Sequence, residues 1–164
     1  MRGELDAAWA RPAQLAMLGD VTGKAVLDLD GAPEPLRSAP GSFDLATSWL
    51  ALHRAPDPVS VLRRAHRALR PGGRLIALIP HPCTAMPFHQ VQRDLAGRMQ
   101  WLGIDRYFDG NPLEVWFAWI RDAGFEVTDL REPVPTEDAV RAQPELEEAR
   151  RVPYFLMFEL SRTP

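Results

Sequence analysis

The sequence predicts an α/β fold, and three observations support this prediction. A short apolar strand is predicted over 25–29, and a longer apolar strand follows over 43–50. A helix over 56–69 then leads into a strand over 74–80, which makes a strand–helix–strand unit with parallel strands. A last apolar strand is predicted over 153–160. Because 46% of the residues are hydrophobic, the chain can bury a core, and disorder is not expected.

Apolar periodicity and turn residues place the helices of the first half. A helix is predicted over 5–18, kinked at Pro12, because its apolar residues fall near one helical face. The helix over 56–69 begins at Pro56-Asp57-Pro58, and Pro71-Gly72-Gly73 ends it and turns the chain into the next strand. The apolar residues of these two helices are Leu5, Ala8, Trp9, Leu15 and Leu18, followed by Val59, Leu62, Ala65 and Leu69.

The second half of the chain has weaker periodicity. A helix is predicted over 88–102, because Val91, Leu95, Met99 and Leu102 would lie on one side of it. The remaining predicted elements are a loop over 104–111, a helix from Pro112 to Asp122, a strand over 125–130 and a charged helical or loop-like segment over 137–151.

Composition excludes several classes of protein. The net charge of −3 provides no basic surface for nucleic acid. Cys83 is the only cysteine, so an internal disulfide cannot form. No apolar run is long enough to span a bilayer, and the N-terminus has no apolar signal core, so we expect a cytoplasmic protein with no membrane contact. The four histidines lack metal-ligand spacing, and no metal site is expected.

Several short motifs follow one another in a fixed order along the whole chain. They are Val26-Leu27-Asp28, Gly41-Ser42-Phe43-Asp44-Leu45, Ala51-Leu52-His53, Leu69-Arg70-Pro71-Gly72-Gly73-Arg74-Leu75, Asp122-Ala123-Gly124-Phe125, Arg131-Glu132-Pro133 and Arg151-Val152-Pro153-Tyr154-Phe155-Leu156. In these motifs the chain resembles the class I S-adenosylmethionine-dependent methyltransferase family, in its methyltransferase type 11-like, small-molecule branch. The resemblance implies a Rossmann-like sheet with helices on both faces and, in the complete family fold, the strand order 3-2-1-4-5-7-6 with strand seven antiparallel.

The chain departs from this family directly after the first strand. The family carries a glycine-rich turn there, whose backbone amides approach the cofactor, but here Asp28 is followed by Leu29-Asp30-Gly31-Ala32-Pro33. Strands two and three and two helices are therefore predicted to be missing, which leaves residues 1–164 as a single truncated methyltransferase-like domain with strand order 1-4-5-7-6. Asp28, Asp30 and the loop over 49–52 remain from the usual cofactor contacts. Because such remnants cannot replace a glycine turn and a helix N-terminus, no bound cofactor is expected.

The loss of two strands also changes the edge of the sheet. Strand one, which is internal in the family, becomes an edge with unpaired backbone groups over 25–28. A partner chain, a loop or the N-terminal helix should cover this edge. We therefore expect a homodimer or a heteromer that associates through strand one.

Ligands of open α/β sheets bind beyond the carboxyl ends of the strands. His53 and His81 each follow a strand on that side and are the candidate catalytic acid/base residues, although histidines at these places also shape the substrate pocket in the resembling branch. The substrate half of the site has few charges, which predicts an apolar small molecule held beneath a lid over 86–116. Its candidate pocket residues are Trp49, Met86, Phe88, Trp101, Tyr107 and Trp116.

Three functions are compatible with these observations. The first is a methyltransferase-fold protein that has lost the S-adenosylmethionine site and binds or transforms an apolar metabolite without a cofactor, in a reaction of cyclase or isomerase type. The second is a non-catalytic partner of a complete methyltransferase. The third is an S-adenosylmethionine-dependent methyltransferase of small molecules whose cofactor site is completed by another subunit.

Overall fold

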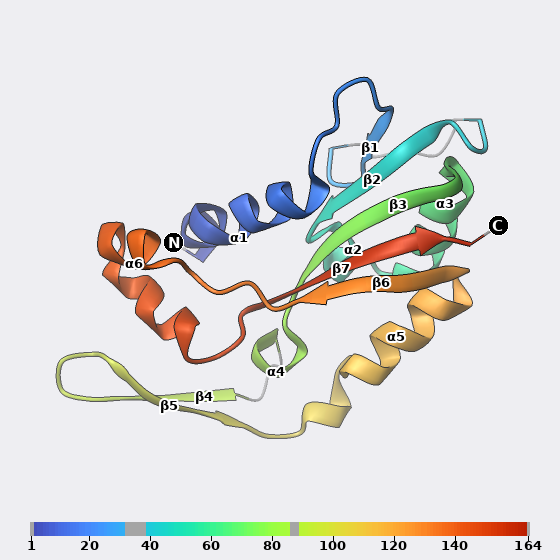
Figure 1. Cartoon of the computed structure of the whole chain (residues 1–164). Helices are drawn as coiled ribbons and strands as arrows, with labels where there is room; N and C mark the ends of the chain where they lie inside the picture. The colour runs from blue at the N-terminus through green and yellow to red at the C-terminus, as the bar shows by residue number, and fades with distance from the viewer. Residues whose placement is uncertain (1, 32–38, 86–88, 164) are drawn as a thin grey trace.

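Five strands form one mixed sheet in the computed structural model, which describes residues 2–31, 39–85 and 89–163 (Figure 1). The strand order is β1-β2-β3-β7-β6, and this confirms the order 1-4-5-7-6 and the α/β fold class that the sequence predicts. The strands are β1 (Val26–Asp28), β2 (Phe43–Trp49), β3 (Leu69–Pro80), β6 (Phe125–Arg131) and β7 (Phe155–Arg162).

The strand directions bring several chain segments to one edge of the sheet. β1, β2 and β3 are parallel, whereas β7 is antiparallel to both β3 and β6. β6 therefore runs in the same direction as β3. As a result, the carboxyl ends of β1, β2, β3 and β6 and the amino end of β7 lie at the same edge, which we call the carboxyl edge.

Helices cover both faces of the sheet, as expected for this fold. One core lies between the sheet and α2, α3 and α5, and a second core lies between the sheet and α1, α6 and η3. No helix in the described part of the chain is both long and apolar enough to cross a bilayer. The helices are α1 (Arg2–Leu18), α2 (Ala51–Arg54), α3 (Pro58–Ala68), α4 (Pro82–Ala85), η2 (Tyr107–Asp109), α5 (Leu113–Asp122), α6 (Glu137–Ala142) and η3 (Pro144–Arg150).

The strand–helix–strand unit has the start and stop signals that the sequence predicts. The Asp57 carboxylate accepts a hydrogen bond of 2.9 Å from the Ser60 N–H and so caps α3. α3 ends at Ala68, and Gly72 adopts a left-handed conformation with φ of 73°. Because glycine takes this conformation without strain, the chain can loop out there before Arg74 pairs with Leu45 of β2.

The predicted helix over 88–102 is wrong. The chain forms a β-hairpin there, of β4 (His89–Arg93) and β5 (Met99–Ile104). Asp94 closes the turn, because its Oδ1 accepts hydrogen bonds from the N–H groups of Ala96 and Arg98, each 2.9 Å long. Gly97 takes the left-handed conformation that the turn needs. This Asp-x-x-Gly turn overrides the helical spacing of the apolar residues.

The hairpin is fixed to η3 by charged side chains. The guanidinium of Arg93 binds the carboxylate of Glu148 through two hydrogen bonds, of which the Nη2–Oε2 bond is 2.9 Å long. Arg151 donates a hydrogen bond of 2.7 Å to the Gln100 carbonyl. Met99 is buried at the same junction. The segment predicted as a lid is therefore attached to the α6–η3 layer.

β1 forms one edge of the sheet. The Ala25 carbonyl accepts from the Leu45 N–H at 3.3 Å, and the Leu29 N–H donates to the Thr47 carbonyl at 2.9 Å. Because backbone groups alternate along a strand, the N–H and C=O of Val26 point away from β2. The Val26 side chain is 39% exposed. Since α1 packs on β3 and β7, it lies over the middle of the sheet.

Proline substitution in β1 tests this assignment. Leu27→Pro removes an N–H that alternation directs at β2 and also a buried leucine side chain, so we expect the free energy of unfolding to fall by about 3 kcal/mol or more. Val26→Pro removes an outward N–H, and we expect a loss below about 1 kcal/mol. Urea unfolding followed by circular dichroism measures both values. Equal losses in the two variants would contradict the assigned direction of the β1 backbone groups.

Candidate functional site

Three polar side chains meet at the carboxyl edge of the sheet. His81 directly follows β3, Cys83 lies in α4, and Glu132 directly follows β6. The Nδ1 atom of His81 lies 2.8 Å from the Cys83 Sγ atom, and its Nε2 atom lies 3.0 Å from Glu132 Oε1. The imidazole therefore bridges a thiol and a carboxylate.

Backbone hydrogen bonds hold His81 in this position. The His81 N–H donates to the Tyr154 carbonyl at 2.8 Å, and the Thr84 hydroxyl donates to the Pro153 carbonyl at 3.0 Å. The His81 carbonyl accepts from the N–H groups of Thr84 and Ala85, each at 2.9 Å. The turn after β3 is thereby fixed to the segment that precedes β7.

The hydrogen bonds favour one tautomer of His81. The Cys83 N–H donates to Nδ1 at 3.2 Å, so Nδ1 is the acceptor and the ring proton lies on Nε2, facing Glu132. Burial lowers the pKa of His81, although the nearby Glu132 carboxylate raises it in part. Burial also raises the pKa of the Cys83 thiol. Near neutral pH, the resting state is therefore a neutral thiol hydrogen-bonded to a neutral imidazole.

Asp30, at the opposite end of the same edge, is engaged by the chain itself. One carboxylate oxygen accepts a hydrogen bond from the Trp49 N–H, and the other forms an ion pair of 2.8 Å with Arg54. Arg54 also donates to the Trp49 carbonyl at 3.3 Å. The Asp30 N–H donates to Asp28 Oδ1 at 3.0 Å. Burial raises the pKa of Asp30 against the opposing influence of the Trp49 N–H and Arg54.

The turn from β2 into α2 contains a strained residue. Leu50 adopts a left-handed conformation with φ of 69°, which costs a residue other than glycine about 1–2 kcal/mol. Its N–H donates to the Leu78 carbonyl at 3.1 Å, and its carbonyl accepts from the Arg54 N–H at 3.1 Å. These bonds hold the turn that places Trp49 and Arg54 around Asp30.

Helix α1 packs against the carboxyl end of β2 and the amino end of β7. The buried Gln14 donates hydrogen bonds to the Ser48 carbonyl at 2.8 Å and to the Thr47 hydroxyl at 3.3 Å. The Arg11 guanidinium lies 5.3 Å from the centre of the Trp49 ring. The Phe155 ring lies between two tryptophans and is 5.5 Å from Trp9 and 6.4 Å from Trp49. Trp49, a predicted pocket residue, thus belongs to this aromatic cluster.

The other predicted site residues lie in different environments. His53 is exposed in α2, where partial desolvation and then Arg54 lower its pKa. Trp101 is exposed on β5. Trp116 belongs to α5, is 3% exposed and packs into the core between this helix and the sheet. The Tyr107 hydroxyl accepts a hydrogen bond of 3.0 Å from the Leu113 N–H. Met86 and Phe88 lie outside the described residues.

Glu132 is the site residue that sequence reasoning missed. It belongs to Arg131-Glu132-Pro133, and it follows a strand that ends at the same edge as β3. The direction of that strand, once assigned, would have predicted the approach to His81. Among the described residues, no three His, Cys, Asp or Glu side chains come together as metal ligands.

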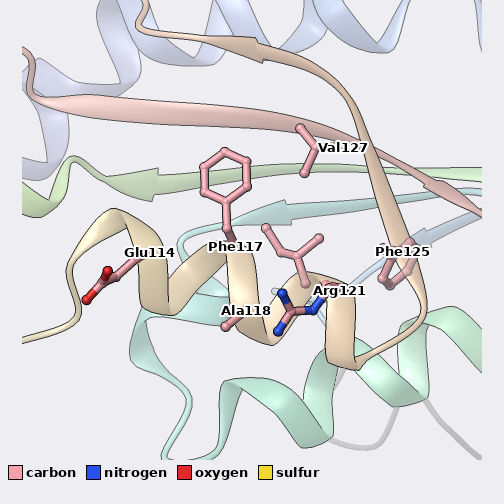
Figure 2. Close-up of a pocket in the computed structure, with 7 residues that line it drawn as sticks. Glu114, Phe117, Ala118, Arg121, Phe125 and Val127 are labelled. Atoms are coloured by element: carbon pink, nitrogen blue, oxygen red, sulfur yellow. The ribbon is translucent and has the colours of Figure 1, made fainter.

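A separate apolar groove lies between α5 and the first half of β6, with a volume of about 400 Å³ (Figure 2). About 16 Å of strand separates Val127, which lines it, from Glu132. The groove is therefore not part of the carboxyl edge. Its lining residues are Glu114, Phe117, Ala118, Ile120, Arg121, Phe125 and Val127.

Comparisons with known proteins agree with this architecture. The family model described as "Methyltransferase domain" matches residues 11–77. A solved structure of an S-adenosylmethionine-dependent methyltransferase from Mesorhizobium loti is 25% identical in sequence, with a TM-score of 0.79. That alignment covers 96% of this chain and 100% of the other. The chain belongs to the class I S-adenosylmethionine-dependent methyltransferase family.

Two curated relatives of this family member are longer proteins. A highly reducing polyketide synthase from Emericella nidulans is 34% identical over 120 residues, which is 72% of this chain and 4% of the synthase. A ubiquinone biosynthesis O-methyltransferase from Xanthomonas euvesicatoria is 32% identical over 93 residues, which is 56% of this chain and 38% of that enzyme. The methyltransferase-family chain thus spans less than half the length of these relatives.

Removal of the Asp30 carboxylate tests its role within this methyltransferase fold. Asp30→Ala leaves the Trp49 N–H without its acceptor, so we expect the free energy of unfolding to fall by about 1–3 kcal/mol. Arg54→Ala removes an exposed partner, and its loss should stay below about 1 kcal/mol. Urea unfolding measures both variants. An Asp30→Ala protein as stable as wild type would show that this carboxylate does not support the edge.

Proposed function

We propose that this methyltransferase-fold protein binds or transforms an apolar small molecule at the carboxyl edge without S-adenosylmethionine, in chemistry of cyclase or isomerase type. The observation that carries the proposal is the internal engagement of Asp30 by Trp49 and Arg54. In the family, an acidic residue in the corresponding loop can contact the adenine of S-adenosylmethionine. The sequence adds that no glycine-rich turn follows Asp28.

His81 supplies the chemistry that this proposal needs. A neutral imidazole that accepts on Nδ1 and faces a carboxylate through Nε2 can take a proton from a substrate and return it. The Glu132 carboxylate would stabilise the imidazolium while it exists. Cyclisations and isomerisations move protons and electron pairs within one molecule, so they need no second substrate. His53, exposed in α2, is the second candidate for this role.

One observation favours a second candidate function. The Mesorhizobium loti structure, whose whole chain is covered by the alignment, is described as an S-adenosylmethionine-dependent methyltransferase. By analogy, the present chain would methylate a small molecule, with a partner subunit supplying backbone amides near Asp28 for the cofactor. A second copy of this chain would not supply them, because its sequence lacks the same turn.

Isothermal titration calorimetry with S-adenosylmethionine and sinefungin distinguishes the two candidate functions. We expect no saturable heat from the isolated wild-type chain, because the residues that hold the cofactor in the family are missing and Asp30 is already engaged. Arg54→Ala, which releases one carboxylate oxygen of Asp30, is the matched control and should also fail to bind. A micromolar dissociation constant for wild type would favour the methyltransferase function instead.

The third proposal concerns a partner on the β1 edge. The outward backbone groups of Val26 and the exposed side chain beside them could pair with a strand of another chain, either a second copy or a complete methyltransferase. Analytical ultracentrifugation of wild type beside Val26→Pro tests self-association. We expect a wild-type dimer that the proline variant weakens at least about tenfold. A wild-type chain that stays monomeric at high concentration would exclude self-association through β1.

A further inference from the structure

We infer that Cys83, His81 and Glu132 form a thiol–imidazole–carboxylate relay in which Cys83 is a nucleophile toward an electron-poor alkene conjugated to a carbonyl group. The relay itself does not depend on the proposed function, whereas the apolar character of its substrate does. The inference adds a covalent step and a nucleophile to a site in which His81 alone was considered.

The geometry of the three side chains carries this inference. The Cys83 Sγ atom lies 2.8 Å from Nδ1, and Glu132 Oε1 lies 3.0 Å from Nε2 on the opposite side of the ring. The imidazole is 9% exposed, so its ring contacts are made largely within the protein. Nucleophile, base and orienting group thus follow one another within hydrogen-bond distance, which is the arrangement that activates thiol nucleophiles.

Two members of the relay come from the turn after β3, and the third comes from the end of β6. His81 is fixed by its N–H bond to the Tyr154 carbonyl, Cys83 follows two residues later in α4, and Glu132 arrives from β6. Cys83 is a residue of intermediate exposure, and the accessibility of its sulfur atom is what the reagent used below tests. Glu132 is the charged group that influences both the His81 and the Cys83 pKa among the described residues.

The electrostatics require the base to act during the reaction. Because burial disfavours the free thiolate, Cys83 does not react as a preformed anion. His81, kept neutral by its lowered pKa, can accept the thiol proton as the sulfur attacks. The resulting imidazolium then faces the Glu132 carboxylate, which compensates its charge.

The covalent step balances without an oxidant or a cofactor. The Cys83 sulfur forms a bond to the β-carbon of the alkene, the S–H proton moves to His81 Nδ1, and the alkene electron pair moves onto the carbonyl oxygen as an enolate. Return of the proton to the α-carbon gives a saturated thioether adduct. In the reverse direction the enolate expels the sulfur. Rotation about the former double bond before expulsion would make the step a cis–trans isomerisation, which is consistent with the proposed function.

The test uses the full chain and 2-cyclohexenone as the probe. Because Cys83 is the only cysteine, the intact-mass adduct that wild type forms and Cys83→Ser does not form reports on this residue. We expect His81→Gln to lower the second-order rate at pH 7 about 100-fold, since it removes the general base. Glu132→Gln should lower it by a smaller factor of about tenfold, and Glu132→Asp should restore part of the loss. Glu126→Gln, which replaces an exposed acid on β6, the strand that Glu132 follows, is the matched control and should react like wild type.

The pH profile separates a relay from a packing role. Above the His81 pKa the wild-type rate should reach a plateau that His81→Gln lacks, because the variant reacts only as its thiolate forms at higher pH. Circular dichroism checks the fold of each variant. Glu132 is half exposed, so Glu132→Gln decides the question if His81→Gln does not fold. Wild-type rates in both glutamine variants would overturn the inference.

Failure of the relay and failure of the cofactor-free function give different experimental results. Micromolar binding of S-adenosylmethionine would contradict the cofactor-free function. If adduct formation still depended on His81, the relay would nevertheless be supported. Adduct rates that do not change when His81 or Glu132 is substituted, in a chain that does not bind S-adenosylmethionine, would contradict the relay. They would leave the cofactor-free function untouched.

Discussion

The hydrogen-bond ladders on the two sides of β3 are the interaction on which the rest of the structure depends. β3 pairs with β2 on one side and β7 on the other, and Leu75 to Ile79 are fully buried between the two helical layers. Because β2 runs parallel to β3 and β7 runs against it, these ladders fix which strand ends share an edge. The approach of His81 to Glu132 follows from that constraint rather than from local sequence.

The carboxyl edge is divided into two chemically different halves. On the β1–β2 side, both carboxylate oxygens of Asp30 are bonded within the chain, one to the Trp49 N–H and the other to Arg54. On the β3–β6 side, His81 keeps proton-accepting capacity beside a thiol. The thiol–imidazole–carboxylate cluster lies on the second side, whereas the exposed His53 of α2 lies on the first.

The sequence predicted the sheet well and the site in part. Strand order followed from the resemblance to the methyltransferase family, because local signals such as the Pro71-Gly72-Gly73 turn identify which strand of the family fold each segment corresponds to. The helix over 88–102 failed, because Asp94 and Gly97 make a turn whose hydrogen bonds outweigh apolar spacing. His81 was predicted from its place after a strand. Its partners were not, since the contact with Glu132 joins segments that follow β3 and β6, two strands separated by β7 in the sheet, and no local pattern encodes it.

The left-handed conformation of Leu50 has a consequence for motion. About 1–2 kcal/mol of backbone strain is held at this turn by the Leu50 N–H bond to the Leu78 carbonyl. When that bond breaks, the strain is released, so the opened turn is favoured by a factor of about 5–30 relative to the same turn built on glycine. The end of β2 is thus biased toward opening, and an opened turn would part the Trp49 N–H from the Asp30 carboxylate.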